Sequence, residues 1–188
     1  DEWVHHDVGR VYVQTFEAAV RNWMGLPSYG MCVFNETCGQ GLAIEHNGDL
    51  YACDHFVEPN YLLGNIQEDH MIELVASEQQ LKFGADKRDT LPQYCLDCDV
   101  RFACHGECPK NRFLSTPDGE SGLNYLCQGY KAFFQHIDKP MQMIAQVMHH
   151  GRPAGQIMPI MAQADVAQAT VSGKIDIAGA GIPADFRC

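Results

Sequence analysis

Cysteine is the residue type in this chain whose number and spacing predict chemistry. Eight of the nine cysteines lie between positions 32 and 127, and the ninth is Cys188. From Cys95 to Cys108 the pattern is Cys-x2-Cys-x5-Cys-x3-Cys. A Cys-x2-Cys turn directs two sulfurs at one metal site, and soft thiolates suit either Zn²⁺ or an iron–sulfur cluster. The array therefore predicts a metal-binding protein.

The spacing of the eight cysteines bears on which metal they bind. Successive members are separated by 5, 14, 41, 2, 5, 3 and 18 residues. Zinc knuckles are built from self-contained sets of four ligands, whereas several of these cysteines have no near partner and must be gathered by the fold. The spacing favours iron–sulfur clusters and leaves zinc as the alternative. Cys188 stands about 60 positions from the next cysteine and is predicted to be a free thiol.

Composition limits the remaining classes of function. The chain begins at Asp1 and shows no secretory signal, and its odd number of cysteines argues against a disulfide framework. A net charge of -11 argues against nucleic-acid binding, which depends on Lys and Arg. No stretch approaches the roughly 20 apolar residues that span a bilayer. We therefore expect a cytoplasmic protein of about one domain that binds neither nucleic acid nor membrane.

The first 31 residues are predicted to be core-forming structure without metal ligands. Residues 1–7 predict the end of a helix. Val11–Phe16 is rich in β-branched and aromatic residues, which predicts a strand, and residues 17–24 predict a short helix. A helix over residues 11–24 is the alternative, because the apolar residues there also fit a 3.6-residue period.

The clearest local signal is Asn47-Gly48, which lies between two short apolar segments. Asn-Gly is the favoured pair for a type I′ turn, in which both residues need a positive φ. The segments on either side are therefore predicted to form a β-hairpin. This hairpin delivers Cys38 at its entry and Cys53 with Asp54 at its exit.

Helices are predicted on both sides of the cysteine-dense segment. Residues 68–88 predict one or two short helices, and residues 89–113 predict a loop. Apolar residues recur at three- and four-residue steps over residues 126–150, which predicts a long final helix. Pro140 falls inside that helix, so we expect a kink or a restart capped by Asp138.

The cysteine array and its flanking text resemble a known family. Cys38-x9-Gly48-x4-Cys53, Cys95-x2-Cys98-x5-Cys104-x3-Cys108 and then Cys127 resemble the seven-cysteine SPASM signature of radical SAM enzymes. The wider text is similar to the anaerobic sulfatase-maturating enzymes. The segments that carry this similarity are Cys32-Val-Phe-Asn-Glu-Thr-Cys38-Gly, Ala43-Ile-Glu-His-Asn-Gly-Asp-Leu-Tyr-Ala-Cys-Asp-His55, Leu63-Gly-Asn-Ile66, Cys104-His-Gly-Glu-Cys-Pro-Lys-Asn and Tyr125-Leu-Cys-Gln-Gly-Tyr130. The resemblance covers about residues 1–150.

The resemblance implies two auxiliary [4Fe–4S] clusters with interleaved ligands. The cluster nearer the active site would be bound by Cys32, Cys38, Cys53 and Cys108. The outer cluster would be bound by Cys95, Cys98, Cys104 and Cys127. Because Cys104 and Cys108 then serve different clusters, the loop, the hairpin and the final helix become one unit whose folding depends on metal.

The resemblance also implies a role for Asp54, which directly follows a cluster ligand. Taken alone, a carboxylate at the end of a hairpin is most simply a turn residue in solvent. Its position matches the general base of a family that converts a Cys or Ser of a sulfatase to formylglycine with a 5′-deoxyadenosyl radical, an electron leaving through the auxiliary clusters. With eight thiolates present, three histidines are interpreted as neighbours of the ligands or solvent residues: His46, His55 and His105.

The resemblance implies components that this sequence does not contain. A third [4Fe–4S] cluster and S-adenosylmethionine need a Cys-x3-Cys-x2-Cys triplet, which is not found, and the chain is too short for the barrel that carries it. We therefore expect the C-terminal portion of a sulfatase maturase, inactive by itself. The implied partners are a sulfatase polypeptide and an external electron donor such as flavodoxin or ferredoxin.

The predicted fold is α+β: a cysteine-rich SPASM auxiliary iron–sulfur domain with a β-hairpin and a C-terminal helix, preceded by the last strand and helix of a partial (β/α)6 radical SAM barrel. We assign residues 1–30 to the barrel end and connector, 31–150 to the SPASM domain and 151–188 to a flexible tail. One alternative is another SPASM enzyme that forms a thioether or a quinone cofactor. The other is a zinc-stabilised protein-binding module without a redox role. Cys32 and the Cys53-Asp54 pair favour the sulfatase branch.

Overall fold

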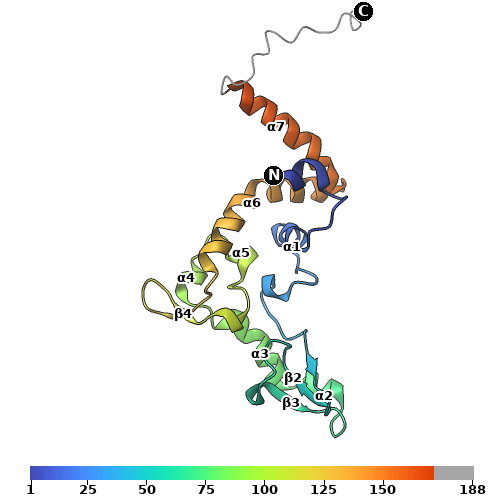
Figure 1. Cartoon of the computed structure of the whole chain (residues 1–188), viewed down its shortest axis with the longest axis vertical. Helices are drawn as coiled ribbons and strands as arrows, with labels where there is room; N and C mark the ends of the chain where they lie inside the picture. Colours follow the sequence, from blue (N-terminus) through green and yellow to red (C-terminus); the bar gives the residue numbers. More distant parts are fainter. Residues whose placement is uncertain (172–188) are drawn as a thin grey trace, which may run out of the picture. The chain divides into compact units, whose positions relative to one another are not determined.

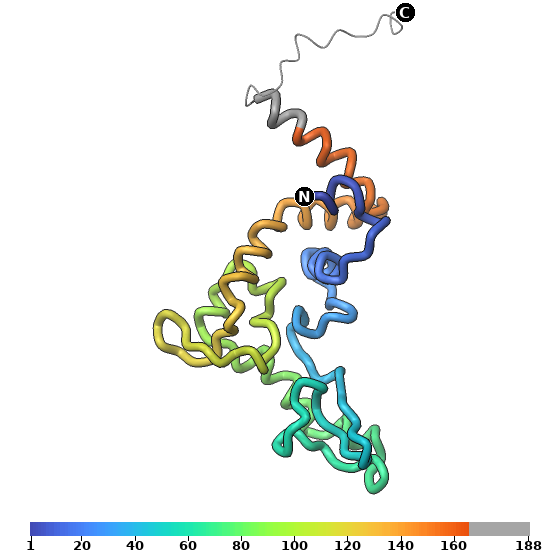
Figure 2. The backbone as a smooth tube through the Cα atoms, viewed as in Figure 1, coloured from blue at the N-terminus to red at the C-terminus, as the bar shows by residue number. Residues whose placement is uncertain are grey.

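The computed structural model describes residues 1–171, with side chains up to residue 165. The chain divides into two compact units. The larger unit is Val13–Gln142, and the smaller unit combines Asp1–Tyr12 with the chain from Met143 onward. Figure 1 and Figure 2 show the course of the backbone within each unit. The eight cysteines of the array all belong to the larger unit.

A three-stranded antiparallel sheet follows the first two cysteines of the array (Figure 1). Its strands, in order, are β1 (Ala43–Ile44), β2 (Asp49–Tyr51) and β3 (Leu62–Asn65). Leu50 in the central strand is fully buried and lies between Ile44 of β1 and Gly64 of β3. The two predicted segments therefore pair, and β3 extends the sheet beyond the predicted hairpin.

The turn between β1 and β2 is not the type I′ turn that Asn47-Gly48 predicts. Asn47 does not adopt a positive φ, whereas Gly48 has a φ of 92°. The Gly48 amide donates to the Glu45 carbonyl, and the Glu45 amide donates to the Asp49 carbonyl. A left-handed glycine that follows a turn in this way forms a bulge. Asn47 contributes through its side chain, which accepts from the Asp49 amide at 3.2 Å and donates to the Asp49 carboxylate at 2.7 Å.

The predicted strand over Val11–Phe16 is wrong, and the alternative helix is correct with a later start. The helix α1 runs over Gln14–Trp23. Its apolar residues follow the helical period and bury one face, on which Ala19 is fully buried. The Trp23 ring meets the Phe102 ring edge-on, with the centroids 4.8 Å apart. This packing decides between the two periods that the sequence allows.

Short helices connect the sheet to the end of the larger unit. The segment predicted to be helical contains α2 (Met71–Val75) and α3 (Glu78–Asp89). The segment predicted to be a loop contains two single-turn helices, α4 (Gln93–Leu96) and α5 (Arg101–Cys104). The remaining elements are the 3₁₀ turns η2 (Cys32–Phe34), η3 (Pro59–Tyr61) and η4 (Pro109–Asn111), and the paired strands β4 (Leu114–Ser115) and β5 (Ser121–Leu123).

The long final helix is confirmed as α6 (Cys127–His149), which continues from the larger unit into the smaller one. Pro140 lies inside α6, and the helix does not restart there. Asp138 therefore caps no second helix. Its carboxylate instead accepts a hydrogen bond from Trp23 Nε1 at 3.0 Å and one from the side-chain nitrogen Nε2 of Gln142 at 2.8 Å.

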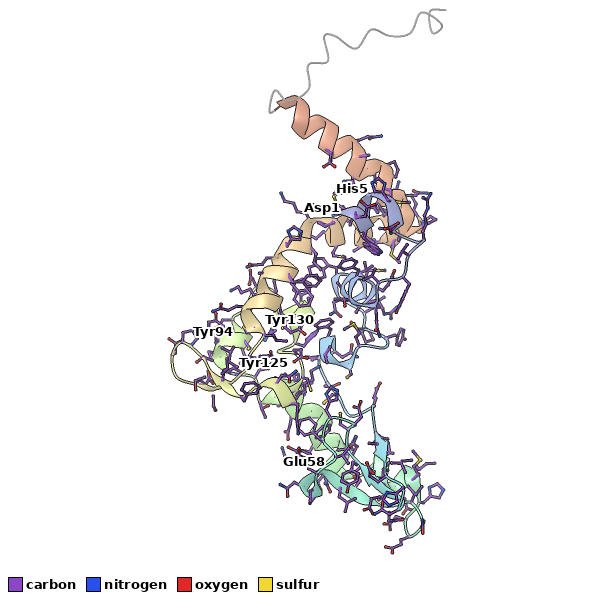
Figure 3. The ribbon with its side chains drawn as sticks, in the orientation of Figure 1. Asp1, His5, Glu58, Tyr94, Tyr125 and Tyr130 are labelled. Carbon is purple, nitrogen blue, oxygen red and sulfur yellow. The ribbon has the colours of Figure 1, made fainter. Side chains whose placement is uncertain are left out.

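The core of the larger unit is aromatic where α6 meets η2. Phe34 and Phe134 are almost fully buried, and their rings meet edge-on with the centroids 5.3 Å apart. Tyr130, labelled in Figure 3, adds a third ring 5.6 Å from that of Phe34. Such pairs add roughly 0.5–1.5 kcal/mol beyond the burial of their area. The cluster fixes η2, and with it Cys32, against α6.

The smaller unit is formed by the end of α6, the π-type turn η1 (Trp3–Asp7), η5 (Ala154–Gln156) and α7 (Ile157–Val171). His5 Nε2 lies 2.7 Å from the Asp165 carboxylate and joins η1 to α7. The helical end predicted for residues 1–7 is confirmed. The helix α7 occupies part of the segment 151–188, for which a flexible tail is predicted.

The predicted free thiol of Cys188 lies outside the described residues. The compact units divide after Tyr12 and after Gln142. These positions differ from the expected segments 1–30, 31–150 and 151–188, which stay a prediction. None of the helices in residues 1–171 combines the length and the hydropathy that a bilayer crossing requires.

Candidate metal centres

Four cysteines from separate parts of the larger unit approach one another near α3. Cys53 follows β2 and Cys108 precedes η4, and both are buried in one apolar cluster. The backbone of Cys38 is held by α3, because its amide donates to the Gly84 carbonyl at 3.2 Å. Cys32 begins η2 and is exposed. We call these four residues the inner set.

Aromatic rings cover the buried part of the inner set. Phe56, Tyr61 and Phe83 pack together with centroid distances between 4.6 and 5.7 Å. They contact the cluster that contains Cys53 and Cys108. Water is therefore excluded from this side, and charges act more strongly there than in bulk solvent.

The other four cysteines line one small cavity at the start of α6. Cys95 lies in α4, Cys98 follows that helix, Cys104 ends α5 and Cys127 begins α6. The Cys98 amide donates to the Cys95 carbonyl at 3.2 Å, which closes the Cys-x2-Cys turn. We call these four residues the outer set.

Electrostatic interactions between the thiols follow the same division. In the inner set, Cys108 interacts with Cys32, Cys38 and Cys53. In the outer set, Cys104 interacts with Cys95, Cys98 and Cys127. The structure thus brings together the two groups of four that the resemblance implies.

Burial raises the pKa of six of these thiols and so favours their protonated form when no metal is bound. It raises the pKa of Cys53 to about 12, and the Asp54 carboxylate adds to the rise. It raises the pKa of Cys95 and of Cys104 to about 11. Metal ligation requires the thiolates, so binding must release protons. A bound cationic centre reverses the balance because it stabilises the thiolates.

The arrangement of the thiols bears on the size of the group that they can hold. Tetrahedral zinc with Zn–S bonds of about 2.3 Å needs sulfurs about 3.8 Å apart. Among the described side chains, no three of Cys, His, Asp or Glu converge closely enough to hold one metal ion. The chemistry of the donors, four soft thiolates in each set, suits a four-iron cluster and also a zinc ion.

Asp54 lies at the solvent edge of the inner set. Its side chain is exposed, and its Oδ1 accepts a hydrogen bond from the Cys53 thiol at 3.2 Å. Its amide donates to the Gly41 carbonyl at 2.9 Å, which fixes the backbone beside the hairpin exit. The position allows the carboxylate to contact both the Cys53 thiol and a molecule from solvent.

The histidines occupy the positions interpreted from the sequence. His55 is a neighbour of the inner set, because its Nδ1 lies 3.4 Å from Cys108 Sγ and its amide 3.5 Å from Cys53 Sγ. His46 is in solvent, with 94% of its side chain exposed. His105 directly follows α5, caps its C-terminal end with a left-handed φ of 48° and is partly buried.

Two cationic residues, Lys87 and Arg112, lie near the thiols, and no pattern in the sequence predicts their position there. Lys87 is only 1% exposed, and its Nζ donates to the carbonyls of Cys32 at 2.6 Å and Val33 at 3.0 Å. Burial lowers the pKa of Lys87 to about 8, and the inner-set thiols oppose this shift. Arg112 lies between the two sets. Both residues sit in polar segments that suggest exposed side chains.

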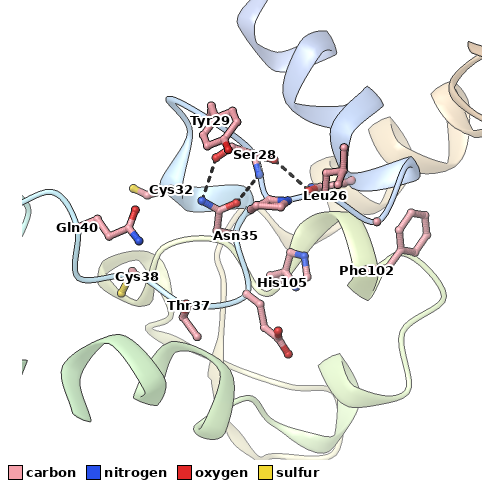
Figure 4. Close-up of a pocket in the computed structure, with 14 residues that line it drawn as sticks. Leu26, Ser28, Tyr29, Cys32, Asn35, Thr37, Cys38, Gln40, Phe102 and His105 are labelled. Carbon is pink, nitrogen blue, oxygen red and sulfur yellow. Dashed lines mark hydrogen bonds between the residues drawn. The ribbon is translucent and has the colours of Figure 1, made fainter. Parts of the chain in front are cut away.

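A cavity of about 500 Å³ opens beside the inner set (Figure 4). Cys32 and Cys38 stand in its wall, with Phe102 on the opposite side. Asn35 fixes the wall by two hydrogen bonds with the backbone of Ser28, at 2.6 and 3.0 Å. Two of the four inner-set cysteines, Cys32 and Cys38, therefore line an open cavity.

Replacement of Gly84 is expected to disturb the inner set. A Cβ at this position would lie 2.6 Å from the Cys38 carbonyl oxygen, so Gly84→Ala must push Cys38 away. Strain of this kind costs about 1–3 kcal/mol. The control is Gly129→Ala in α6, where a Cβ meets nothing within 4 Å and alanine favours the helix. We expect a lower Tm and lower iron content for Gly84→Ala alone; equal values for the two variants would contradict this.

The sequence of this chain is similar to a known domain family and to known enzymes. The SPASM family, an iron–sulfur cluster-binding domain, matches residues 32–99. A serine-type anaerobic sulfatase-maturating enzyme of Bacteroides thetaiotaomicron is 49% identical over 155 residues, which are 82% of this chain and 37% of that protein. The cysteine-type enzyme of Clostridium perfringens is 32% identical over 127 residues, or 68% of this chain and 34% of that protein. The chain belongs to the anaerobic sulfatase-maturating enzymes.

Solved structures of a sulfatase-maturating enzyme share the fold. The structure of anSMEcpe with bound AdoMet and Cp18Cys peptide gives a TM-score of 0.64 at 28% identity, over 78% of this chain and 39% of that one. A structure of the same enzyme with AdoMet and Kp18Cys peptide gives 0.63. The chain corresponds to the C-terminal portion of these enzymes and spans about a third of the length of the curated relatives.

Proposed function

We propose that this chain holds two [4Fe–4S] clusters, one on each set, within an enzyme that oxidises a Ser or Cys of a sulfatase to formylglycine. The observation that carries the proposal is the division of eight thiols into two sets of four. The division interleaves along the chain, since Cys104 belongs to the outer set and Cys108 to the inner set. Four thiolates per site are the donor set of a four-iron cluster.

The residues around the inner set are suited to hold such a cluster. When bound, a [4Fe–4S] cluster supplies a centre that accepts one electron at a time. His55 is placed to donate to Cys108 Sγ through its ring and to Cys53 Sγ through its amide. Hydrogen bonds to the ligand sulfurs and nearby positive charge both favour the reduced cluster. Lys87 supplies such a charge from inside the protein.

Asp54 is the residue that we assign to proton removal. Conversion of a serine to formylglycine removes one Cβ hydrogen atom, the hydroxyl proton and one electron. A carboxylate within hydrogen-bond reach of the hydroxyl can take the proton. The contact of Asp54 with Cys53 and its exposed side chain support this role, because they put the base beside an electron-accepting site.

The remaining components belong to the rest of the enzyme. We assign a third [4Fe–4S] cluster and S-adenosylmethionine to sequence beyond this chain, which spans 37% of its Bacteroides relative. The AdoMet bound in the solved relatives supports this assignment. A sulfatase polypeptide would be the substrate, and flavodoxin or ferredoxin the external electron donor.

The substrate assignment is tested with two peptides that differ at one position. The complete enzyme is given a Cys-x-Pro-x-Arg peptide and its serine counterpart, and the products are read by mass spectrometry. We expect formylglycine from the serine peptide, because serine-type relatives are 49% and 36% identical to the chain and the cysteine-type relative 32%. A thioether crosslink, or no aldehyde from either peptide, would favour the other SPASM maturases.

A further inference from the structure

The loop between Cys104 and Cys108 has an uncommon backbone. Its three residues all adopt a positive φ: His105 at 48°, Gly106 at 70° and Glu107 at 53°. Only glycine adopts this region without steric cost, so two of the three residues are strained. Such a loop persists when surrounding contacts hold it in place. It is also the segment that separates a ligand of the outer set from a ligand of the inner set.

Arg112 supplies the contacts that hold this loop. Its Nε donates to the Gly106 carbonyl at 2.9 Å, and one terminal nitrogen donates to the carbonyls of His105 at 3.0 Å and Glu107 at 3.1 Å. The other terminal nitrogen donates to the Lys87 carbonyl of α3 at 2.7 Å. The planar guanidinium thus joins all three carbonyls of the loop to a neighbouring helix.

Gly106 makes room for the guanidinium. A Cβ at this position would lie 2.8 Å from an Arg112 terminal nitrogen and 2.3 Å from a methyl carbon of Leu91. A side chain there would therefore exclude Arg112 from the loop. Two features require a glycine at this position: the left-handed backbone conformation and the close approach of the Arg112 guanidinium.

The charge of Arg112 acts on both sets of thiols. It interacts with Cys95 and Cys104 of the outer set and with Cys108 and Cys38 of the inner set. Within the part of the chain that the structure describes, Arg112 forms no ion pair with a carboxylate. The buried carboxylate of Glu107 accepts instead from the amides of Asn111 and Asn124. The positive charge is therefore directed at the thiols and the loop carbonyls.

We infer that Arg112 is a positioning residue that holds Cys104 and Cys108 in separate sets and places one positive charge between the two clusters. The inference rests on the proposed clusters. Each four-thiolate cluster carries a net charge of about −2, and a nearby cation stabilises the more negative reduced form. One substitution at this position must then change both clusters, although they share no ligand.

The charge is tested with Arg112→Gln in the complete iron-loaded enzyme. We expect the midpoint potentials of both auxiliary clusters, followed by EPR during redox titration, to become more negative. The control is Arg88→Gln, which removes an exposed arginine that pairs with Asp89. Potentials of both clusters equal to those of the control would overturn the inference, as would a change in only one.

The positioning role is tested with Arg112→Lys, which keeps the charge but cannot donate to four carbonyls at once. We expect less iron per chain than in Arg88→Gln, and unchanged potentials in the clusters that form. Full iron content and unchanged thermal stability of Arg112→Lys would overturn this role. This test does not depend on whether Arg112→Gln binds its clusters. Absence of iron from the wild-type enzyme would contradict the proposed clusters. Failure of the clusters is thereby distinguished from failure of the role inferred for Arg112.

Discussion

Cys98→Ala is expected to lower the iron content of the chain to about half, from roughly eight to roughly four atoms. The reason is that Cys98 belongs to the outer set alone, so its loss removes one cluster and leaves the four inner-set thiols in place. The measurement is iron and acid-labile sulfide per chain after anaerobic purification, with EPR of the reduced protein. One of two cluster signals should disappear.

Two companion variants sharpen this result. Cys38→Ala should also remove about half of the iron but should eliminate the other signal, because Cys38 belongs to the inner set. Cys188→Ala is the control, since Cys188 is predicted to be a free thiol, and it should keep all of the iron. Unchanged iron in Cys98→Ala would contradict the outer set. Loss of the same signal in Cys98→Ala and Cys38→Ala would contradict the division into two sets.

Asp54→Asn in the complete enzyme is expected to reduce formylglycine formation by about 10²-fold or more, the usual contribution of a positioned general base. The asparagine keeps the size of the side chain and loses the ability to take a proton. Iron content and cleavage of S-adenosylmethionine should stay unchanged, because Asp54 is not a ligand in either set. Product formation and 5′-deoxyadenosine release are measured in the same reaction.

The control for this variant is Asp118→Asn, which changes an exposed carboxylate in the turn between β4 and β5. It should leave all three quantities unchanged. Full turnover by Asp54→Asn would remove the carboxylate from the mechanism. Loss of iron in Asp54→Asn would assign it a structural role through its contact with Cys53.

The family of the cysteine array was predictable because cysteine spacing and flanking text carry information that does not depend on local geometry, and the ligand role of each cysteine stays a prediction. The long α6 was predictable for the same kind of reason, since its apolar period persists over six turns. Residues 11–24 were harder, because a short apolar segment fits both periods until tertiary packing decides. The Asn47-Gly48 turn shows a similar limit: the pair marked the turn, but hydrogen bonds of Asn47 with Asp49 selected its form.

The residues that hold the sets together could not be predicted. Lys87 belongs to a charged helix and Arg112 to a polar loop, and such residues are usually exposed. Their burial depends on carbonyl groups that only the folded chain gathers: Cys32 and Val33 for Lys87, and the left-handed loop for Arg112. Sequence spacing therefore predicts the ligands, whereas their supporting contacts appear only in three dimensions.

The central claim is that two interleaved sets of thiols hold two four-iron clusters. The most direct measurement is metal analysis with EPR on this 188-residue chain, expressed and purified without oxygen. Two clusters predict roughly eight iron atoms and eight sulfides per chain, with two signals after reduction. Two zinc ions per chain with no iron would contradict the claim and would favour a zinc-stabilised module.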